Sequence, residues 1–150
     1  MTISVLTDCS ITFQQLDFAT TPPTPTGPVY DLSDHIASVV LETVIEPVET
    51  TEVGQQYKRV IAGLGTNTVS FEFLQDFDTN SVEDVFFPWI GTRVLAKVKP
   101  SSSATSVQNP QYEFQVLISQ WIPLNAAVGS LSTVNVGWPI SGPITKTTTP

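Results

Sequence analysis

The sequence predicts a mainly β domain that carries one short helix. Along most of the chain, apolar and polar residues alternate, which is typical of strands with one buried face. One segment, residues 80–90, has its apolar residues at helical spacing instead. With 150 residues the chain has the usual size of one domain and can bury a core without disulfides. We therefore expect residues 1–150 to form a single domain.

Seven stretches have the composition of strands. They cover residues 3–6, 11–13, 36–46, 69–77, 93–99, 112–118 and 132–138. The clearest is the stretch 69–77, where Val69, Phe71, Phe73 and Phe77 place bulky apolar side chains at odd positions. The stretch 36–46 is apolar on both faces in its middle, which predicts a strand that is covered on both sides. Pro139 is expected to end the last stretch.

The helix is expected within residues 80–90. Its apolar residues at helical spacing are Val82, Val85, Phe86 and Trp89. Asn80 or Ser81 can serve as the N-cap, and two acidic residues follow in the first turn, where they favour helix formation. Pro88 should end the helix near Phe86, because proline disfavours helical geometry in the residue before it.

Three segments are expected to lie outside this regular pattern. The first 29 residues should hold an N-terminal hairpin and then, at 20–28, an exposed loop rich in proline and threonine, inserted before the main domain. Residues 47–57 form a connection between strands that is longer than a hairpin requires, and such loops are often functional. Residues 143–150 should form a C-terminal arm, a last strand that frays.

The composition argues against a protein that binds nucleic acid. Six basic and fourteen acidic residues give a net charge of −8, the wrong sign for a domain that neutralises phosphates. A negative surface instead repels DNA and lets it slide past. Hydrophobic residues make up 41% of the chain and charged residues only 13%. We therefore expect much of the surface to be covered by neighbouring subunits.

The cellular compartment is predicted from the cysteine content and the apolar runs. Cys9 is the only cysteine, and the first residues lack the basic and apolar regions of a secretory signal. Folding in a reducing cytoplasm is therefore expected. Since no apolar run approaches the roughly 18 residues that span a bilayer, we expect no membrane segment.

The sequence contains no recognisable catalytic, metal-binding or cofactor-binding pattern, so we expect a protein that is not an enzyme. His35 lies beside Asp34, but the side chains of neighbours in an extended chain point in opposite directions. Asp34 therefore cannot orient His35 as a general base through this adjacency. Cys9 has no second cysteine with which to hold zinc, and we expect an inert thiol. Asp76 and Asp78 lack the further ligands of a calcium loop and should be solvated charges at a strand end.

Charged residues gather in two places. The cations Arg93, Lys97 and Lys99 occupy odd positions of one strand and should project from one face. The acidic residues Glu46, Glu49 and Glu52 cluster in and beside the long loop. Both groups can be ordinary solvated charges. A sharper hypothesis is that the basic face of one subunit meets the acidic loop of the next and steers assembly.

Seven short motifs follow one another from Tyr30 onward. They are Y-D-L-S-D-H-I (30–36), Y-K-R-V-I-A-G-L (57–64), S-F-E-F-L-Q-D-F (70–77), F-P-W-I-G-T (87–92), K-P (99–100), N-P-Q-Y (109–112) and V-G-W-P-I-S-G-P-I-T-K (136–146). Each motif alone is weak, but their order and spacing are fairly specific. In the order and the spacing of these motifs, the chain resembles the major tail proteins, or tail tube proteins, of long-tailed (siphovirus-type) bacteriophages, especially those of actinobacterial hosts.

This resemblance implies the phage tail tube fold, an antiparallel β-sandwich or half-barrel with one short flanking helix. It implies hexameric rings that stack into a tube, with the strands joined into one inner barrel and with the long loop, including Val53 and Tyr57, reaching toward an adjacent ring or subunit. The implied partners are other copies of the chain, a tape measure protein and a tail terminator, and genomic DNA passes through without stable binding. The implied location is the virion tail, assembled in the host cytoplasm.

Two other interpretations stay open. A ring-forming tail terminator or baseplate component with the same fold would form closed rings instead of long tubes. A β-sandwich that decorates a capsid or binds carbohydrate would bind glycans without self-assembly. Carbohydrate sites usually place aromatic residues on loops, whereas Trp89, Trp121 and Trp138 lie within or at the ends of predicted elements, which indicates packing.

Overall fold

The computed structural model describes residues 8–150, and these form seven strands, one α-helix and two short 3-10 helices. In chain order the elements are β1 (Ser10–Asp17), β2 (Thr24–Asp31), η1 (Ser33–His35), β3 (Ile36–Glu49), β4 (Val60–Leu74), α1 (Val82–Phe86), η2 (Phe87–Trp89), β5 (Arg93–Lys99), β6 (Gln111–Leu117) and β7 (Thr133–Thr147). The prediction of a mainly β fold with one short helix is confirmed. The predicted stretch 3–6 lies outside the described residues.

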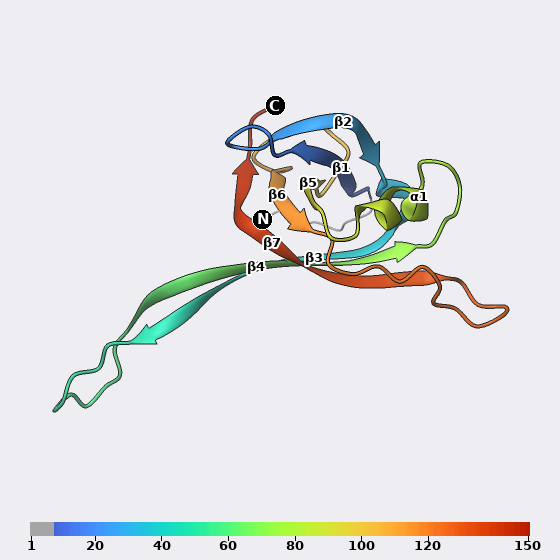
Figure 1. The fold of residues 1–150 in the computed structure, drawn as a ribbon. Coiled ribbons are helices and arrows are strands. Elements are labelled where there is room, and N and C mark those ends of the chain that lie inside the picture. The colour runs from blue at the N-terminus through green and yellow to red at the C-terminus, as the bar shows by residue number, and fades with distance from the viewer. Residues whose placement is uncertain (1–7) are drawn as a thin grey trace.

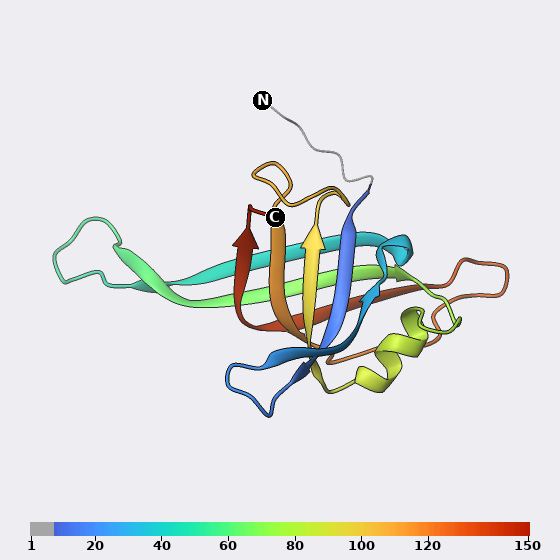
Figure 2. The ribbon, with the colours of Figure 1, turned by 90° about the horizontal axis from the view of Figure 1, so that it is seen from above.

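All seven strands belong to one antiparallel sheet with the order β2-β1-β5-β6-β7-β4-β3. β7 bends, so that residues 133–139 pair with β4 whereas residues 140–147 pair with β6. The sheet therefore folds over into two layers (Figure 1). We call β3, β4 and residues 133–139 of β7 the long-strand layer, and the remaining strands the short-strand layer. The strands of the two layers run crosswise, as Figure 2 shows.

The prediction that Pro139 ends a strand is wrong. Pro139 is the last residue of β7 that pairs with β4, and Ile140 is the first that pairs with β6. The proline, which has no N–H to donate, thus lies where β7 changes partners, the point at which a missing donor interrupts the ladders least. The predicted C-terminal arm at 143–150 is, up to Thr147, the second half of this strand and pairs with β6.

The core lies between the two layers. The odd positions Val69, Phe71 and Phe73 of β4 face it, as predicted. Six aromatic rings gather at its centre: Phe13, Phe71, Phe73, Phe86, Trp121 and Trp138. Both of these tryptophans and Trp89 are buried, so the prediction that the tryptophans are packing residues is confirmed.

β4 ends at Leu74, three residues before the predicted end. The backbone N–H of Asp78 donates to Oδ1 of Asp76 at 3.0 Å. Such an aspartate turn bends the chain away from the strand direction. As a result Phe77, which we expected to continue the buried row, is 62% exposed.

The helix agrees with its prediction. α1 begins after Ser81, one of the two predicted N-caps, whose backbone is extended. Val82, Val85 and Phe86 are buried against the sheet. The α-helix ends at Phe86, and Pro88 lies in the following 3-10 turn. The helix flanks one side of the sandwich (Figure 1).

The predicted insertion at 20–28 is instead largely part of the sheet. Residues from Thr24 onward form β2, which pairs with β1, so the N-terminal hairpin consists of these two strands. β2 lies at an edge of the sheet, and Pro25 and Pro28 are tolerated there because an edge strand leaves part of its backbone unpaired. The extended and exposed character that the composition predicts is nevertheless found.

β3 lies at the other edge and is not covered on both faces, contrary to the prediction. Val39 and Leu41 pack partly against the core, but Val40 on the opposite face is 54% exposed. β3 continues to Glu49 and β4 begins at Val60, so the connection predicted at 47–57 comprises residues 50–59. The two-sided apolar pattern therefore belongs to a strand whose outer face is not covered by any of residues 8–150.

Candidate assembly surfaces

The far halves of β3 and β4 form a two-stranded arm that leaves the body of the molecule (Figure 1). Pairing of β4 with β7 begins at Thr68, so the preceding residues of β4 pair only with β3, although the side chain of Asn67 still donates to the carbonyl oxygen of Gly142 at 2.8 Å. We call residues 44–66 the arm. Because an isolated two-stranded hairpin is at best marginally stable in water, this arm is expected to gain stability by packing on another surface.

The arm carries large apolar side chains that remain exposed. Each is at least 46% accessible: Val44, Ile45, Val48, Val53, Tyr57, Val60, Ile61 and Leu64. Fully burying one such side chain is worth about 1.5–3 kcal/mol. Many exposed apolar side chains on one projecting element are typical of a site of association. The arm therefore has a strong tendency to be buried by a partner.

Two glycines allow the strands of the arm to approach closely. A Cβ atom on Gly63 would lie 2.7 Å from the carbonyl oxygen of Glu46, and one on Gly65 would lie 2.9 Å from Cδ1 of Ile45. The register of β3 against β4 shifts between Ile45 and Pro47, opposite these glycines. The bulge and the glycines together determine how the arm bends and twists.

Five of the predicted interface residues lie on the arm: Glu46, Glu49, Glu52, Val53 and Tyr57. The loop at its tip is closed by a hydrogen bond from the N–H of Thr50 to the carbonyl oxygen of Arg59 at 2.8 Å. Glu49 lies 3.7 Å from Lys58, and both side chains are exposed. Such a pair adds roughly 0–1 kcal/mol. An interaction this weak does not prevent the Glu49 carboxylate from contacting another molecule.

The three predicted cations lie on the outer face of β5, as expected, but each has a partner in its own chain. Nη1 of Arg93 donates to Oγ of Ser141 at 3.0 Å, and the guanidinium lies 4.7 Å above the ring of Phe18. Lys97 lies 3.9 Å from Glu113, the residue opposite it on β6. The remaining cation, Lys99, donates to a loop carbonyl oxygen at 3.1 Å.

Within one subunit the structure does not bring the acidic and basic groups together. The three glutamates lie on the arm, whereas the cations lie on the short-strand layer of the body. Leu95 interrupts the basic row and is itself buried. A contact between the two groups would therefore need two subunits, and it stays a hypothesis.

A second projection, missed by the sequence reasoning, lies between β6 and β7. Residues 118–132 contain no charged side chain, and three of their apolar residues, Leu124, Val128 and Leu131, are highly exposed. In Figure 1 this loop and the arm extend from opposite ends of the molecule. A stretch of 15 residues without charge in an acidic chain was the feature that could have revealed it.

His35 and Asp76 form a contact that the sequence reasoning did not foresee. Nε2 of His35 lies 2.7 Å from Oδ2 of Asp76 and 3.3 Å from Oγ of Ser81. Hydrogen bonds from the Asp78 N–H, from Ser81 and from His35 lower the pKa of Asp76 to about 2. Asp76 is therefore not the simple solvated charge that was predicted.

This cluster does not have the geometry of a catalytic triad. In a triad, serine and aspartate contact different nitrogens of the histidine ring. Here Asp76 and Ser81 both approach Nε2 of His35. The cluster instead links the beginning of β3 to the segment that leads into α1, which is a structural role.

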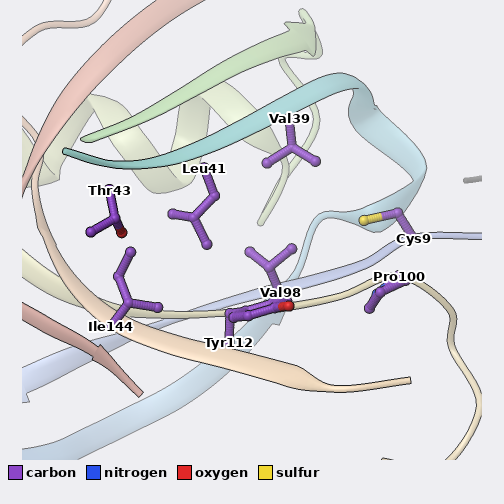
Figure 3. Close-up of a pocket in the computed structure, with 8 residues that line it drawn as sticks. All are labelled: Cys9, Val39, Leu41, Thr43, Val98, Pro100, Tyr112 and Ile144. Carbon is purple, nitrogen blue, oxygen red and sulfur yellow. The ribbon is translucent and has the colours of Figure 1, made fainter. Parts of the chain in front are cut away.

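An apolar cavity of about 360 Å³ opens beside β3. Figure 3 shows Val39, Leu41 and Thr43 of β3 on one side of it and residues of the short-strand layer on the other. Cys9 lies at one end, where burial and the nearby charge of Asp8 raise the pKa of the thiol. A raised pKa favours the protonated thiol, which is the less reactive form. That Cys9 is inert stays a prediction.

The described residues offer no candidate for a metal site or for a membrane-spanning helix. Among residues 8–150, no group of three or more histidine, cysteine, aspartate or glutamate side chains could hold a metal ion. In the same part of the chain, none of the helices has both the length and the apolar character needed to cross a membrane.

Solved structures of phage-like particles share this fold. The SPP1 tail tube is matched with a TM-score of 0.68 and 11% identity, over 96% of this chain and 78% of the other. A chain from the virion of a native gene transfer agent particle is matched with a TM-score of 0.61 and 14% identity, over 97% and 99% of the two chains. A chain from the six-fold symmetrised baseplate of the anti-feeding prophage gives 0.64 and 8%, over 99% and 97%.

At this level of identity the likeness shows a common fold. The chain therefore has the fold found in a tail tube, in a gene transfer agent virion and in a baseplate. No protein-family model and no curated protein matches the sequence. The link to siphovirus-type phages of actinobacterial hosts stays a prediction.

Proposed function

We propose that the chain is a structural subunit of a phage tail tube, which assembles into stacked hexameric rings and forms the conduit for DNA ejection. The observation that carries this proposal is the arm, which exposes eight large apolar residues, six on two strands that pair only with each other there among residues 8–150 and two in the loop between them. The shared fold with the SPP1 tail tube supports the same assignment. The subunit is a building block, not an enzyme.

In the proposed tube, the arm of one subunit packs on a subunit of an adjacent ring. Burying even three of its side chains would contribute several kcal/mol, on the order of 1.5–3 kcal/mol for each. Part of that gain offsets the loss of translational and rotational freedom on association. Contacts that repeat head to tail in this way give open-ended growth.

The charged groups add orientation to this contact. Glu46, Glu49 and Glu52 of one arm would approach Arg93 and Lys97 of a neighbouring subunit. Charge pairs at a rim change the rate and register of association more than its affinity. The net charge of −8 lets DNA pass along the finished tube without stable binding.

Other proteins must set the length of the proposed tube. A tape measure protein and a tail terminator are the proposed partners that set the length and close the end. Assembly takes place in the host cytoplasm, and the product is part of the virion tail.

Electron microscopy and sedimentation of the purified protein at rising concentration test the proposal. We expect long hollow tubes from the wild type. Leu64→Asp on the arm should abolish them, because a charge would be buried at the contact. Val107→Asp is the matched control, since Val107 is similarly exposed but lies on a loop outside both projections. A wild type that stays monomeric at every concentration would refute the proposal.

The charge pairing has its own test. Reversing Arg93 and Lys97 to glutamate should block tube growth, and adding Glu49→Lys and Glu52→Lys should restore it. Normal growth of the first variant would eliminate the pairing while leaving the tube assignment intact. Circular dichroism of the unassembled variants checks that the loss of the Ser141 and Glu113 contacts has not unfolded the subunit.

A second candidate function is a ring-forming component of a baseplate or tail end. The similarity to the anti-feeding prophage baseplate favours it, since that match spans nearly all of both chains. The same micrographs separate the two candidates. Closed rings that never stack would indicate the baseplate role, and long tubes would indicate the tail tube.

A further inference from the structure

The apolar cavity beside β3 opens at an edge of the sheet and lies between the two layers. Figure 3 shows Leu41 and Thr43 of β3 pointing toward Val98 and Ile144 of the short-strand layer. None of the described residues that line the cavity carries a charge. Its volume of about 360 Å³ is within the range of pockets that hold a ligand. An apolar group that fills such a cavity removes apolar surface from water, which is favourable.

A pair of exposed apolar side chains projects from the turn that follows α1. Phe87 is 55% exposed and Ile90 is 43% exposed. The N–H of Ile90 donates to the carbonyl oxygen of Phe87 at 3.5 Å, and residues three apart in a 3-10 turn lie on the same side. Residues 85–92 contain no charged side chain. We call Phe87 and Ile90 the knob.

The knob lies near the opposite edge of the long-strand layer. Gly91, the residue after the knob, donates its N–H to the carbonyl oxygen of Ile118 at 2.7 Å. Two residues further along the chain, the carbonyl oxygen of Gln120 accepts a hydrogen bond from Nε1 of Trp138 on β7 at 2.8 Å. Figure 2 shows α1 and β3 on opposite sides of the sandwich. The cavity and the knob therefore belong to opposite sides of one subunit.

Sheet extension between identical subunits would bring these two sides together. In the described part of the chain, β3 and residues 133–138 of β7 each have one side without a paired strand. The nearest prolines are Pro47, which lies in the arm, and Pro139, where β7 changes partners. Because both strands are antiparallel to β4, they run in the same direction. Copies with one common orientation can therefore pair edge to edge around a ring.

We propose that the cavity beside β3 is a socket that receives Phe87 and Ile90 of a neighbouring copy in the same ring. This inference rests on the proposed tube and identifies a contact within each ring. The knob matches the uncharged, apolar lining and lies on the side that edge-to-edge pairing brings to the socket. Phe18 is a weaker candidate on the same side, because the guanidinium of Arg93 already lies 4.7 Å from its ring centroid.

An exchange of volume between knob and socket tests this contact. Thr43 lines the cavity but is itself exposed, so Thr43→Phe narrows the socket without disturbing the core. Phe87→Ala should raise the lowest protein concentration at which tubes form about ten- to hundredfold, and Thr43→Phe should raise it as well. The double variant should assemble better than Thr43→Phe alone, because the smaller knob leaves room for the added ring. Phe18→Ala is the matched control and should assemble like the wild type.

A disulfide identifies the two surfaces directly. Cys9 is the only cysteine of the chain and lies at one end of the cavity. Tubes of Phe87→Cys and of Ile90→Cys are oxidised with copper phenanthroline in air and separated on a non-reducing gel. We expect at least one of them to give linked subunits up to the hexamer, and no such products once Cys9→Ala is added. Val128→Cys, in the loop 118–132, is the control that should form no bond with Cys9.

Several results would overturn the inference. Tubes of both cysteine variants without a bond to Cys9 would assign the cavity to another occupant, such as residues 1–7 of the same chain. Products that continue beyond the hexamer would place the contact between rings. Impaired assembly of Phe18→Ala with normal assembly of Phe87→Ala would assign the socket to the turn between β1 and β2.

The design also covers variants that fail to assemble. If neither cysteine variant forms tubes, the volume exchange decides, and equal assembly of Thr43→Phe and of the double variant then overturns the contact. If the wild type forms no tubes, the proposed function fails, and the socket fails with it. If wild-type tubes form but the knob and Cys9 do not meet in them, only the socket is lost.

Discussion

Truncation of Phe86 should remove a large part of the stability of the subunit. This side chain of α1 is fully buried among the other aromatic rings of the core. Its ring centroid lies 4.9 Å from that of Phe13, 5.1 Å from those of Phe73 and Trp121, and 5.3 Å from that of Trp138. Changing a buried phenylalanine to alanine costs about 3–5 kcal/mol. Because these four ring contacts and a fifth, with Trp89 at 6.1 Å, are lost, each worth about 0.5–1.5 kcal/mol, we expect a value in the upper part of that range.

The next residue supplies the control. Phe87 is 55% exposed, so Phe87→Ala should cost less than about 1 kcal/mol. Urea unfolding of unassembled subunits, followed by tryptophan fluorescence, gives both values on the same scale. Equal losses for the two variants would refute the argument, because they would mean that α1 does not place Phe86 in the core.

Two further predictions concern the arm and the His35 cluster. Gly63→Ala puts a Cβ atom 2.7 Å from the Glu46 carbonyl oxygen, which should distort the arm. Tube assembly measured by sedimentation should therefore fall, while the midpoint of urea unfolding of the body stays unchanged. Normal assembly of this variant would show that the close approach of the two strands is unimportant. The pKa of Asp76 is lowered to about 2, so its carboxylate stabilises the fold above its usual pKa, and this contribution is lost as the pH falls toward about 2. In urea titrations, the free energy of unfolding of the wild type and of the control Asp78→Asn should therefore fall more on acidification than that of Asp76→Asn. The same dependence of this free energy on pH in all three proteins would contradict the stabilising role of the Asp76 carboxylate.

The sequence patterns that predicted structure correctly are those set by local physics. Alternation at Val69, Phe71 and Phe73 predicts which face of β4 is buried, because side chains of a strand alternate between its two sides. The helical spacing of Val82, Val85 and Phe86 predicts α1, and Pro88 gives its end. These features depend on residues close together in the chain, so they can be read without knowing the fold.

The errors arose where the outcome depends on distant partners. Pro139 lies within β7 because two different strands pair on either side of it, and no local pattern shows that exchange. The contact between His35 and Asp76 joins residues 41 positions apart in the chain. Likewise, the apolar middle of β3 predicted burial, but alternation cannot distinguish cover by the same chain from cover by a neighbour.

The candidate site was predicted only in part. The long connection after β3 and its residues Val53 and Tyr57 were identified from loop length and resemblance, and they lie near the tip of the arm. The uncharged loop 118–132 was missed because strand and helix patterns are both absent from it. The partners of Arg93 and Lys97 within the subunit were also missed, since opposing residues such as Glu113 become neighbours only through strand pairing.

In the proposed assembly, the distribution of proline over the strand edges helps to explain how a subunit with so many unpaired backbone groups can form one defined assembly. An unprotected edge pairs with any available strand, which is the usual route to aggregation. Here Pro25 and Pro28 of β2 and Pro143 in the second half of β7 weaken pairing along the edges of the short-strand layer, whereas the long-strand layer has proline only at Pro47 and Pro139. Sheet extension therefore favours the long-strand layer. The arm and the loop 118–132 extend from opposite ends of the molecule, so a contact between them can repeat head to tail from one subunit to the next. Sideways pairing then completes a ring, whereas end-to-end contacts add rings without limit, which is why growth would need a separate protein to stop it.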